Sequence, residues 1–92
     1  MGLDFLDVCF RLERRFNVRL ERADFEHLWN RKPFDLTAGE LHEILCKQLH
    51  DAGRPVPISS WNAVRLELGD TLGMSPLQIR RETWMGHDLG MY

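Results

Sequence analysis

Residues 4–16 read DFLDVCFRLERRF, and this stretch decides the fold class of the chain. Its apolar residues recur at steps of three and four, which places them along one face of an α-helix. They are Phe5, Val8, Cys9, Leu12 and Phe16. Asp4 and Asp7 fall in the first turns, where the positive end of the helix dipole stabilises carboxylates. The sequence therefore predicts an amphipathic helix from about Asp4 to Arg15.

The chain leaves this helix in an extended conformation, because Phe16, Val18 and Leu20 alternate with polar residues. A short helix is predicted over Ala23–Trp29. Its buried side would be formed by Phe25, Leu28 and Trp29. Pro33 then favours a loop, since the residue before a proline is disfavoured in the helical region.

A second long helix is predicted from the sequence TAGE at residues 37–40. Thr37 followed three residues later by Glu40 is the pattern of a capping box, in which two backbone N–H groups are satisfied reciprocally. The apolar face of this helix carries Leu41, Ile44, Leu45 and Leu49. The helix should end near Asp51–Gly53. The prolines at positions 55 and 57 indicate an extended linker after it.

The last predicted helix is capped by Ser59 or Ser60 and ends at Leu72, before the helix-stopping Gly73. Its apolar face carries Trp61, Val64, Leu68 and Leu72. Ser75 and Pro76 predict one further helical turn. Residues 80–92 show no clean period and are expected to form a structured loop. No segment has a strand pattern, so the sequence predicts a small all-α bundle of three to four helices.

Composition indicates one globular domain. The chain has 92 residues, of which 43% are hydrophobic and 28% charged, and its net charge is −2. Acidic and basic residues are mixed, whereas nucleic-acid binding favours a one-signed basic stripe, so no nucleic-acid partner is expected. No apolar run approaches the length of a membrane helix, and no signal-peptide pattern is present. These features predict a cytoplasmic protein without a membrane partner, in which Cys9 and Cys46 are reduced, largely buried thiols.

Residues 2–20, GLDFLDVCFRLERRFNVRL, resemble the second helix of acyl carrier proteins and its exit. The positions that match by residue or by type are Leu3, Asp4, Leu6, Asp7, Leu12, Glu13, Phe16, Val18 and Leu20. The sequence ADFEHLW at 23–29 falls where the short third helix of a carrier would be. DLTAGELHEIL at 35–45 is similar to the start of the fourth.

Residues 64–91, VRLELGDTLGMSPLQIRRETWMGHDLGM, resemble the part that a carrier has first. They are similar to its opening helix, its L-G-x-S-P-x-x-I turn and its T-x-x-x-x-D-L-G approach to the prosthetic-group motif. The resemblance implies an acyl-carrier-like bundle with permuted helix order. Residues 1–53 would be the second to fourth carrier helices, 54–59 a linker, and 60–92 the first helix and following loop. The two ends of the chain are then expected to lie close together, in a monomer or in a domain-swapped homodimer.

The carrier family attaches 4'-phosphopantetheine through the serine of a D-S-L motif, and Gly2 stands at that position. It is flanked by Leu3 and Asp4 on one side and by Leu89 and Gly90 on the other. Because glycine has no hydroxyl group, no cofactor is expected. The resemblance then implies a non-catalytic adaptor that binds a protein partner. The alternative is an atypical carrier component that binds acyl groups non-covalently or acts with a partner.

Residues that could contact a partner are predicted on the first helix and near the C-terminus: Asp4, Asp7, Arg11, Arg14, Arg15 and Trp84. Carriers typically present an acidic second helix to basic surfaces, and the arginines here interrupt that pattern. A partner is therefore expected to differ from the usual carrier enzymes.

Two other kinds of site are weighed against this reading. His42, Cys46 and His50 are spaced four residues apart, which suits soft metal ions, but three residues over two turns cannot all reach one ion without strain. The simpler interpretation has Cys46 at the edge of the apolar face and the histidines in solvent. Cys9 lies on an apolar stripe, and His87 and Asp88 have no assignable third partner, so no enzymatic activity is expected.

Overall fold

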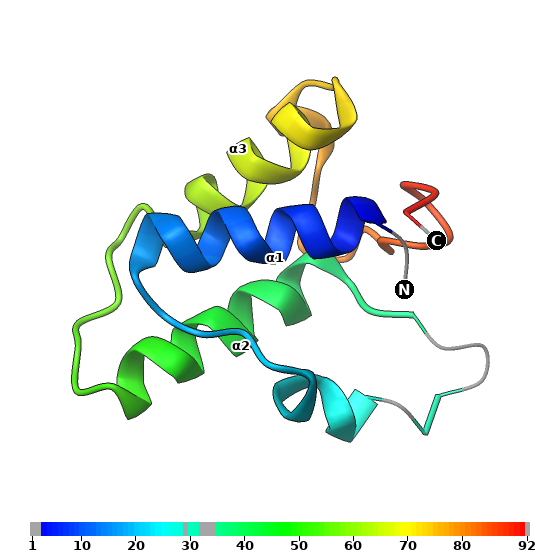
Figure 1. Ribbon diagram of the computed structural model, residues 1–92. Helices are drawn as coiled ribbons and strands as arrows, with labels where there is room; N and C mark the ends of the chain where they lie inside the picture. Colours follow the sequence, from blue (N-terminus) through cyan, green and yellow to red (C-terminus); the bar gives the residue numbers. More distant parts are fainter. Residues whose placement is uncertain (1–2, 29, 32–34, 92) are drawn as a thin grey trace.

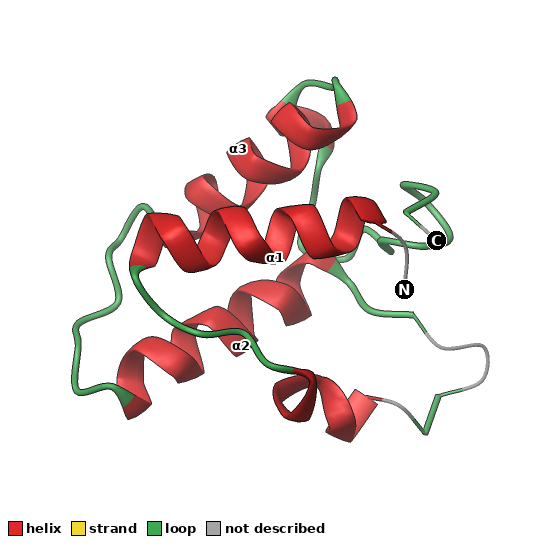
Figure 2. Cartoon of the chain, viewed as in Figure 1, coloured by secondary structure: helices red, strands yellow, loops and turns green. Residues whose placement is uncertain are grey.

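The computed structural model describes residues 3–28, 30–31 and 35–91. In chain order these form α1 (Leu3–Phe16), the 3₁₀ helix η1 (Arg22–Leu28), α2 (Ala38–Asp51), α3 (Ser60–Leu72) and the 3₁₀ helix η2 (Pro76–Gln78), as Figures 1 and 2 show. The described residues include no strand. A single isolated antiparallel bridge joins Thr37 to Trp84. The predicted all-α class is confirmed.

Helix α3 holds the bundle together, because it packs against both α1 and α2. Its side chains Ala63, Val64 and Leu68 are buried in one apolar core with the stripe of α1 and with the inner face of α2. Ion pairs from Arg11 to Asp70 and from Arg15 to Glu67 join α1 and α3 at the rim of this core.

Most helix ends follow the predicted capping residues. The hydroxyl of Thr37 accepts a hydrogen bond from the N–H of Glu40 at 3.1 Å, and the Glu40 carboxylate accepts one from the N–H of Thr37 at 2.8 Å. Gly73 ends α3 in the left-handed conformation at φ 68°. Ser75 accepts from the N–H of Leu77 at the start of η2. Each of these ends was predictable because the cap and its partner lie within three residues.

The predicted serine cap of α3 is wrong. Ser59 occupies the N-cap position, yet its side chain makes no capping hydrogen bond, because its backbone is not extended there (φ −81°, ψ 5°). Ser60 is buried, and its hydroxyl instead lies 2.7 Å from the ring of His42 on α2. A tertiary contact therefore takes the hydroxyl that the sequence pattern assigned to a local cap.

The other boundaries shift by a residue or two. The predicted short helix is the 3₁₀ helix η1, with Phe25 and Leu28 buried as expected. Trp29, Met1, Gly2 and Tyr92 lie outside the described residues.

The C-terminal segment, residues 79–91, is bound along the start of α2. The N–H groups of Ala38 and Gly39 donate to the carbonyls of Thr83 (2.9 Å) and Arg81 (2.8 Å). A Cβ atom on Gly39 would lie only 2.8 Å from the Arg81 carbonyl oxygen. Since real Cβ atoms do not approach an oxygen so closely, glycine is required where the segment crosses the helix.

Replacing Gly39 with alanine is expected to destabilise the protein by about 1–3 kcal/mol, as overpacked sites do. The same change in an open helix position stabilises by up to about 1 kcal/mol, because alanine favours helix. Urea unfolding followed by circular dichroism measures the difference. Glu43→Ala, at an exposed position of the same helix, should leave the midpoint nearly unchanged. A stabilised Gly39→Ala variant would contradict this close approach.

Candidate functional site

Asp35 anchors the loop that precedes the C-terminus. Its carboxylate is 8% exposed and accepts hydrogen bonds from the N–H groups of Gly86 (2.8 Å), His87 (2.9 Å) and Leu36 (2.8 Å). The carbonyl of Leu36 accepts another from the N–H of Met85 at 2.9 Å. A buried carboxylate needs such donors, since an unpaired buried charge is very costly. The loop that contains Gly86 and His87 is thereby bound to the start of α2.

Next to this anchor, four side chains from three parts of the chain form a polar cluster. Helix α2 contributes His42 and Cys46, α3 contributes Ser60, and the C-terminal segment contributes Arg81. The His42 Nε2 atom lies 2.7 Å from the Ser60 hydroxyl and 3.3 Å from the Cys46 sulfur. A guanidinium nitrogen of Arg81 lies 3.2 Å from His42 Nδ1. The Arg81 guanidinium also stacks 4.6 Å from the centre of the Trp61 ring.

The arginine determines the tautomer of His42. A guanidinium only donates hydrogen bonds, so Nδ1 must accept and Nε2 carries the ring hydrogen. Burial, and secondly the positive charge of Arg81, lower the pKa of His42. Burial raises the pKa of the Cys46 thiol, and a hydrogen bond from Ser60 partly opposes this. The cluster is therefore a directed chain of hydrogen bonds from Arg81 through His42 towards the sulfur.

This direction limits the chemistry of the cluster. A general base for the Ser60 hydroxyl would need a free ring lone pair facing it, and here that position carries hydrogen. A metal ion on Nε2 would place the Nδ1 hydrogen against Arg81, where two donors would oppose each other. As described, the residues lock α2, α3 and the C-terminal segment together.

The three residues weighed as metal ligands, for which no metal site was predicted, are only partly brought together. His42 and Cys46 are in contact, while His50, one turn further along α2, is exposed and belongs to no such cluster. The expectation that His42 is solvated is wrong, because Ser60 and Trp61 from α3 cover it. Within the described ranges, no three His, Cys, Asp or Glu side chains are arranged to hold a metal ion. The two cysteines are free thiols; Cys9 is buried, and burial raises its pKa to about 12.

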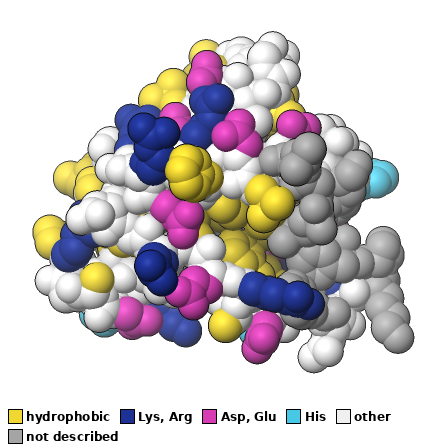
Figure 3. All heavy atoms as spheres, viewed as in Figure 1, with side chains coloured by type: hydrophobic (Ala, Val, Ile, Leu, Met, Phe, Trp, Pro, Cys, Tyr) yellow, Lys and Arg dark blue, Asp and Glu magenta, His cyan; other side chains and the backbone are white. Residues whose placement is uncertain are grey.

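The outward face of α1 is the main candidate for a docking surface. Leu6 and Phe10 project one turn apart and are 57% and 56% exposed. Around them, Asp4, Asp7 and Arg14 are exposed and Arg11 is half-buried, whereas the exposed Arg15 lies on the α3 side of the helix, where it pairs with Glu67. Figure 3 views the molecule from the α1 side and shows hydrophobic side chains open to solvent between acidic and basic ones. Sequence analysis singled out the charged residues here but not Leu6 and Phe10 as solvent-facing apolar groups.

Trp84, the remaining predicted contact residue, is 37% exposed and held from one side. The Arg31 guanidinium lies 5.7 Å from the centre of its ring and makes a paired ionic contact with Glu40. The contact with Arg31 is the main cause that lowers the pKa of Glu40, and the hydrogen bond from the Thr37 backbone lowers it further. The side chain of Trp84 is thus only partly available to a partner.

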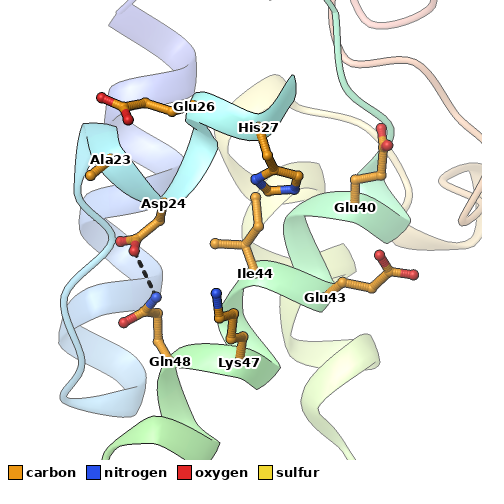
Figure 4. A pocket seen from close by; sticks show the side chains of 9 residues that line it. All are labelled: Ala23, Asp24, Glu26, His27, Glu40, Glu43, Ile44, Lys47 and Gln48. Carbon is orange, nitrogen blue, oxygen red and sulfur yellow. Dashed lines mark hydrogen bonds between the residues drawn. The ribbon is translucent and has the colours of Figure 1, made fainter. Parts of the chain in front are cut away.

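A groove of about 540 Å³ lies between η1 and α2 (Figure 4). Seven of its nine lining residues are polar or charged, and the amide of Gln48 donates to the Asp24 carboxylate at 2.8 Å across one end. Its apolar lining comes from Ala23 and Ile44. The groove is therefore more polar than the site that an acyl chain requires.

His42 makes stability depend on pH in a defined window. Its pKa is lowered in the folded protein, so between that pKa and the unfolded value of about 6.5 only the unfolded chain takes up a proton. Stability present above pH 6.5 is therefore lost as the pH falls. The denaturation midpoint should therefore drop as the pH falls through the unfolded value of about 6.5.

Replacing His42 with glutamine should flatten that pH dependence. His50→Gln, on the exposed side of the same helix, should leave it as in the parent protein. Equal slopes in the parent and the His42 variant would show that this ring does not titrate as the geometry requires.

Replacing Asp35 with alanine is expected to lower the free energy of unfolding by about 2 kcal/mol, since buried N–H groups lose their acceptor. Hydrogen exchange should accelerate first at the amides of Gly86 and His87. Asp51→Ala, at the exposed end of α2, serves as the control for removing one carboxylate. Unchanged exchange at residues 85–89 in the Asp35 variant would contradict the anchoring role.

The described residues include no helix long and apolar enough to cross a membrane. No family model, curated protein or solved structure that was compared with the chain matches it. What the protein does is therefore inferred from its own side chains and surfaces.

Proposed function

We propose that this chain is a non-catalytic interaction module built on an acyl-carrier-like bundle with permuted helix order. The order of elements supports the proposal: a long α1, a short η1 and a long α2 follow one another, and α3 packs against both long helices. That is the arrangement expected if α3 corresponds to the first helix of a carrier.

The position of the C-terminal segment also supports the permuted order. In Figure 1 the beginning of α1 and the end of this segment lie at the same end of the molecule. Met91 and Phe5 are both buried, at 1% and 2% exposure, in the same core. A connection across this end would restore the chain order of a carrier.

The observation that carries the interaction role is the apolar surface on α1. Exposure of the Leu6 and Phe10 side chains to water costs free energy in proportion to their exposed apolar area. Exposed apolar surface of this kind commonly serves to bind a partner. Helix α1 is also the element that resembles the partner-facing helix of carriers. Its arginines give it a mixed charge, so its partner differs from the basic surfaces that carriers meet.

Two alternatives are weaker by comparison. Non-covalent acyl binding would require an apolar site, and seven of the nine residues that line the groove between η1 and α2 are polar or charged. A small metal-binding protein would need His50 near His42 and Cys46, and His50 is exposed away from them.

The absence of the prosthetic group can be tested directly. Incubation with coenzyme A and a broad-specificity phosphopantetheinyl transferase should leave the intact mass unchanged, because Gly2 offers no hydroxyl. An authentic acyl carrier protein in the same reaction is the positive control. A gain of the arm's mass would overturn this part of the proposal, and peptide mapping would then identify the modified serine.

The permuted order can be tested by rejoining. Linking residue 92 to residue 1 and opening the chain within residues 54–58 should keep the helix content, because all helix contacts are retained and only connectivity changes. Adding Gly2→Ser to that chain should create a poor but detectable transferase substrate. Circular dichroism and intact mass are the measurements. An unfolded rejoined chain, alongside a folded parent, would argue against the permuted carrier.

A further inference from the structure

The outward face of α1 has a self-complementary pattern of charge. We propose that it binds a second copy of this chain through an antiparallel contact between the two α1 helices. This inference rests on the proposed function, because it names the partner of the same surface.

The positions of Asp7, Phe10 and Arg14 along α1 support this proposal. In an α-helix with a rise of about 1.5 Å per residue, Asp7 lies about 4.5 Å before Phe10 and Arg14 about 6 Å after it. At about 100° per residue, the three side chains leave the helix within about 60° of one another. A two-fold axis at Phe10 therefore places Asp7 of each copy beside Arg14 of the other.

Only the antiparallel arrangement has this property. Two α1 helices side by side in parallel would oppose Asp7 to Asp7 and Arg14 to Arg14, which is repulsive. A two-fold contact uses the same surface on both subunits, so one favourable pair is always accompanied by its symmetric equivalent. The charge order along α1 thus selects a second copy in one orientation.

The neighbouring charges leave Arg14 available. Arg11 is held by Asp7 and Asp70, and Arg15 by Glu67, all within the chain. Arg14 is exposed and forms no ion pair within the described part of the chain. Its contact there is with the ring of Phe10, 5.6 Å from the guanidinium to the ring centre. Asp7 shares its carboxylate with Arg11 but keeps 47% of its side chain exposed.

The apolar part of the contact lies between these charges. Phe10 would meet its own equivalent across the axis, and Leu6 would cover the edge of the ring pair, which removes both exposed side chains from water. The two symmetric ion pairs are exposed and contribute about 0.2–1 kcal/mol each. The surface is small, so the dimer should be weak, concentration-dependent and sensitive to salt.

A charge-exchange series tests the proposal by sedimentation equilibrium of the full chain. The parent should self-associate, and Asp7→Arg or Arg14→Asp alone should weaken association at least about tenfold, since each creates two like-charge contacts. The double variant Asp7→Arg/Arg14→Asp should restore it to near the parent value. Phe10→Ser should abolish it, and circular dichroism establishes that each variant is folded.

Two control variants test whether self-association depends on the outward face of α1 and not on the rest of the helix. Arg15→Ala, on the α3 side of α1, and Asp70→Asn, which releases Arg11 without touching Asp7, should leave the dimer unchanged. High salt, about 0.5 M, should weaken the parent dimer, because it screens the two ion pairs. The apolar contact between the two copies should be little affected by salt.

A parent that stays monomeric over the accessible concentrations would overturn the inference. A dimer that ignores the single exchanges would overturn it as well, and would indicate a domain swap or another face. Neither result affects the transferase experiment, whose outcome decides the prosthetic-group part of the proposed function separately.

Discussion

The buried carboxylate of Asp35 accepts three backbone N–H groups, two of them from a loop about fifty residues further along the chain. Together with the backbone hydrogen bonds of Leu36, Ala38 and Gly39, this interaction holds the C-terminal segment against α2. Because the segment is bound there, the Arg81 carbonyl lies over Gly39 and the Arg81 guanidinium reaches His42. The placement of this segment against α2 thus determines both the backbone crossing and the polar cluster.

In the polar cluster, the cation of Arg81 determines the chemical role of the neighbouring side chains. Serine, histidine and cysteine side chains in contact would ordinarily suggest a nucleophile or a metal ligand. Arg81 occupies the lone-pair side of His42, and the ring hydrogen then faces Ser60 and Cys46. These side chains therefore hold α2 and α3 together, and burial shifts the pKa values of His42 and Cys46 towards their neutral forms.

Helix α1 divides the molecule into a packed side and an open side. Its stripe from Phe5 to Phe16 is buried in the core, and α3 covers one flank through ion pairs with Arg11 and Arg15. The remaining flank carries Leu6 and Phe10 in solvent. Because no further element among the described residues covers this flank, a partner that packs on it would bury both side chains. The proposed adaptor role rests on that surface.

Local sequence determined the helices and most of their ends. The three- and four-residue spacing from Phe5 to Phe16 placed the buried face of α1, and Thr37 with Glu40, Gly73 and Ser75 with Pro76 each marked a boundary. These signals were readable because the interacting groups are at most a few residues apart, so the chain conformation alone brings them together.

Tertiary structure decided the rest. Asp35 and Gly39 carry no local sign of their partners, which lie more than forty residues away. Ser60 was predicted as a possible helix cap and His42 as a solvated residue. The local sequence pattern at each position is the same whether or not another helix packs against it, so it could not indicate that these two side chains meet. The sequence by itself thus specified which helices form. The packing of α3 and of the C-terminal segment decided which polar groups are in contact, because these contacts depend on the distance between segments in space and not along the chain.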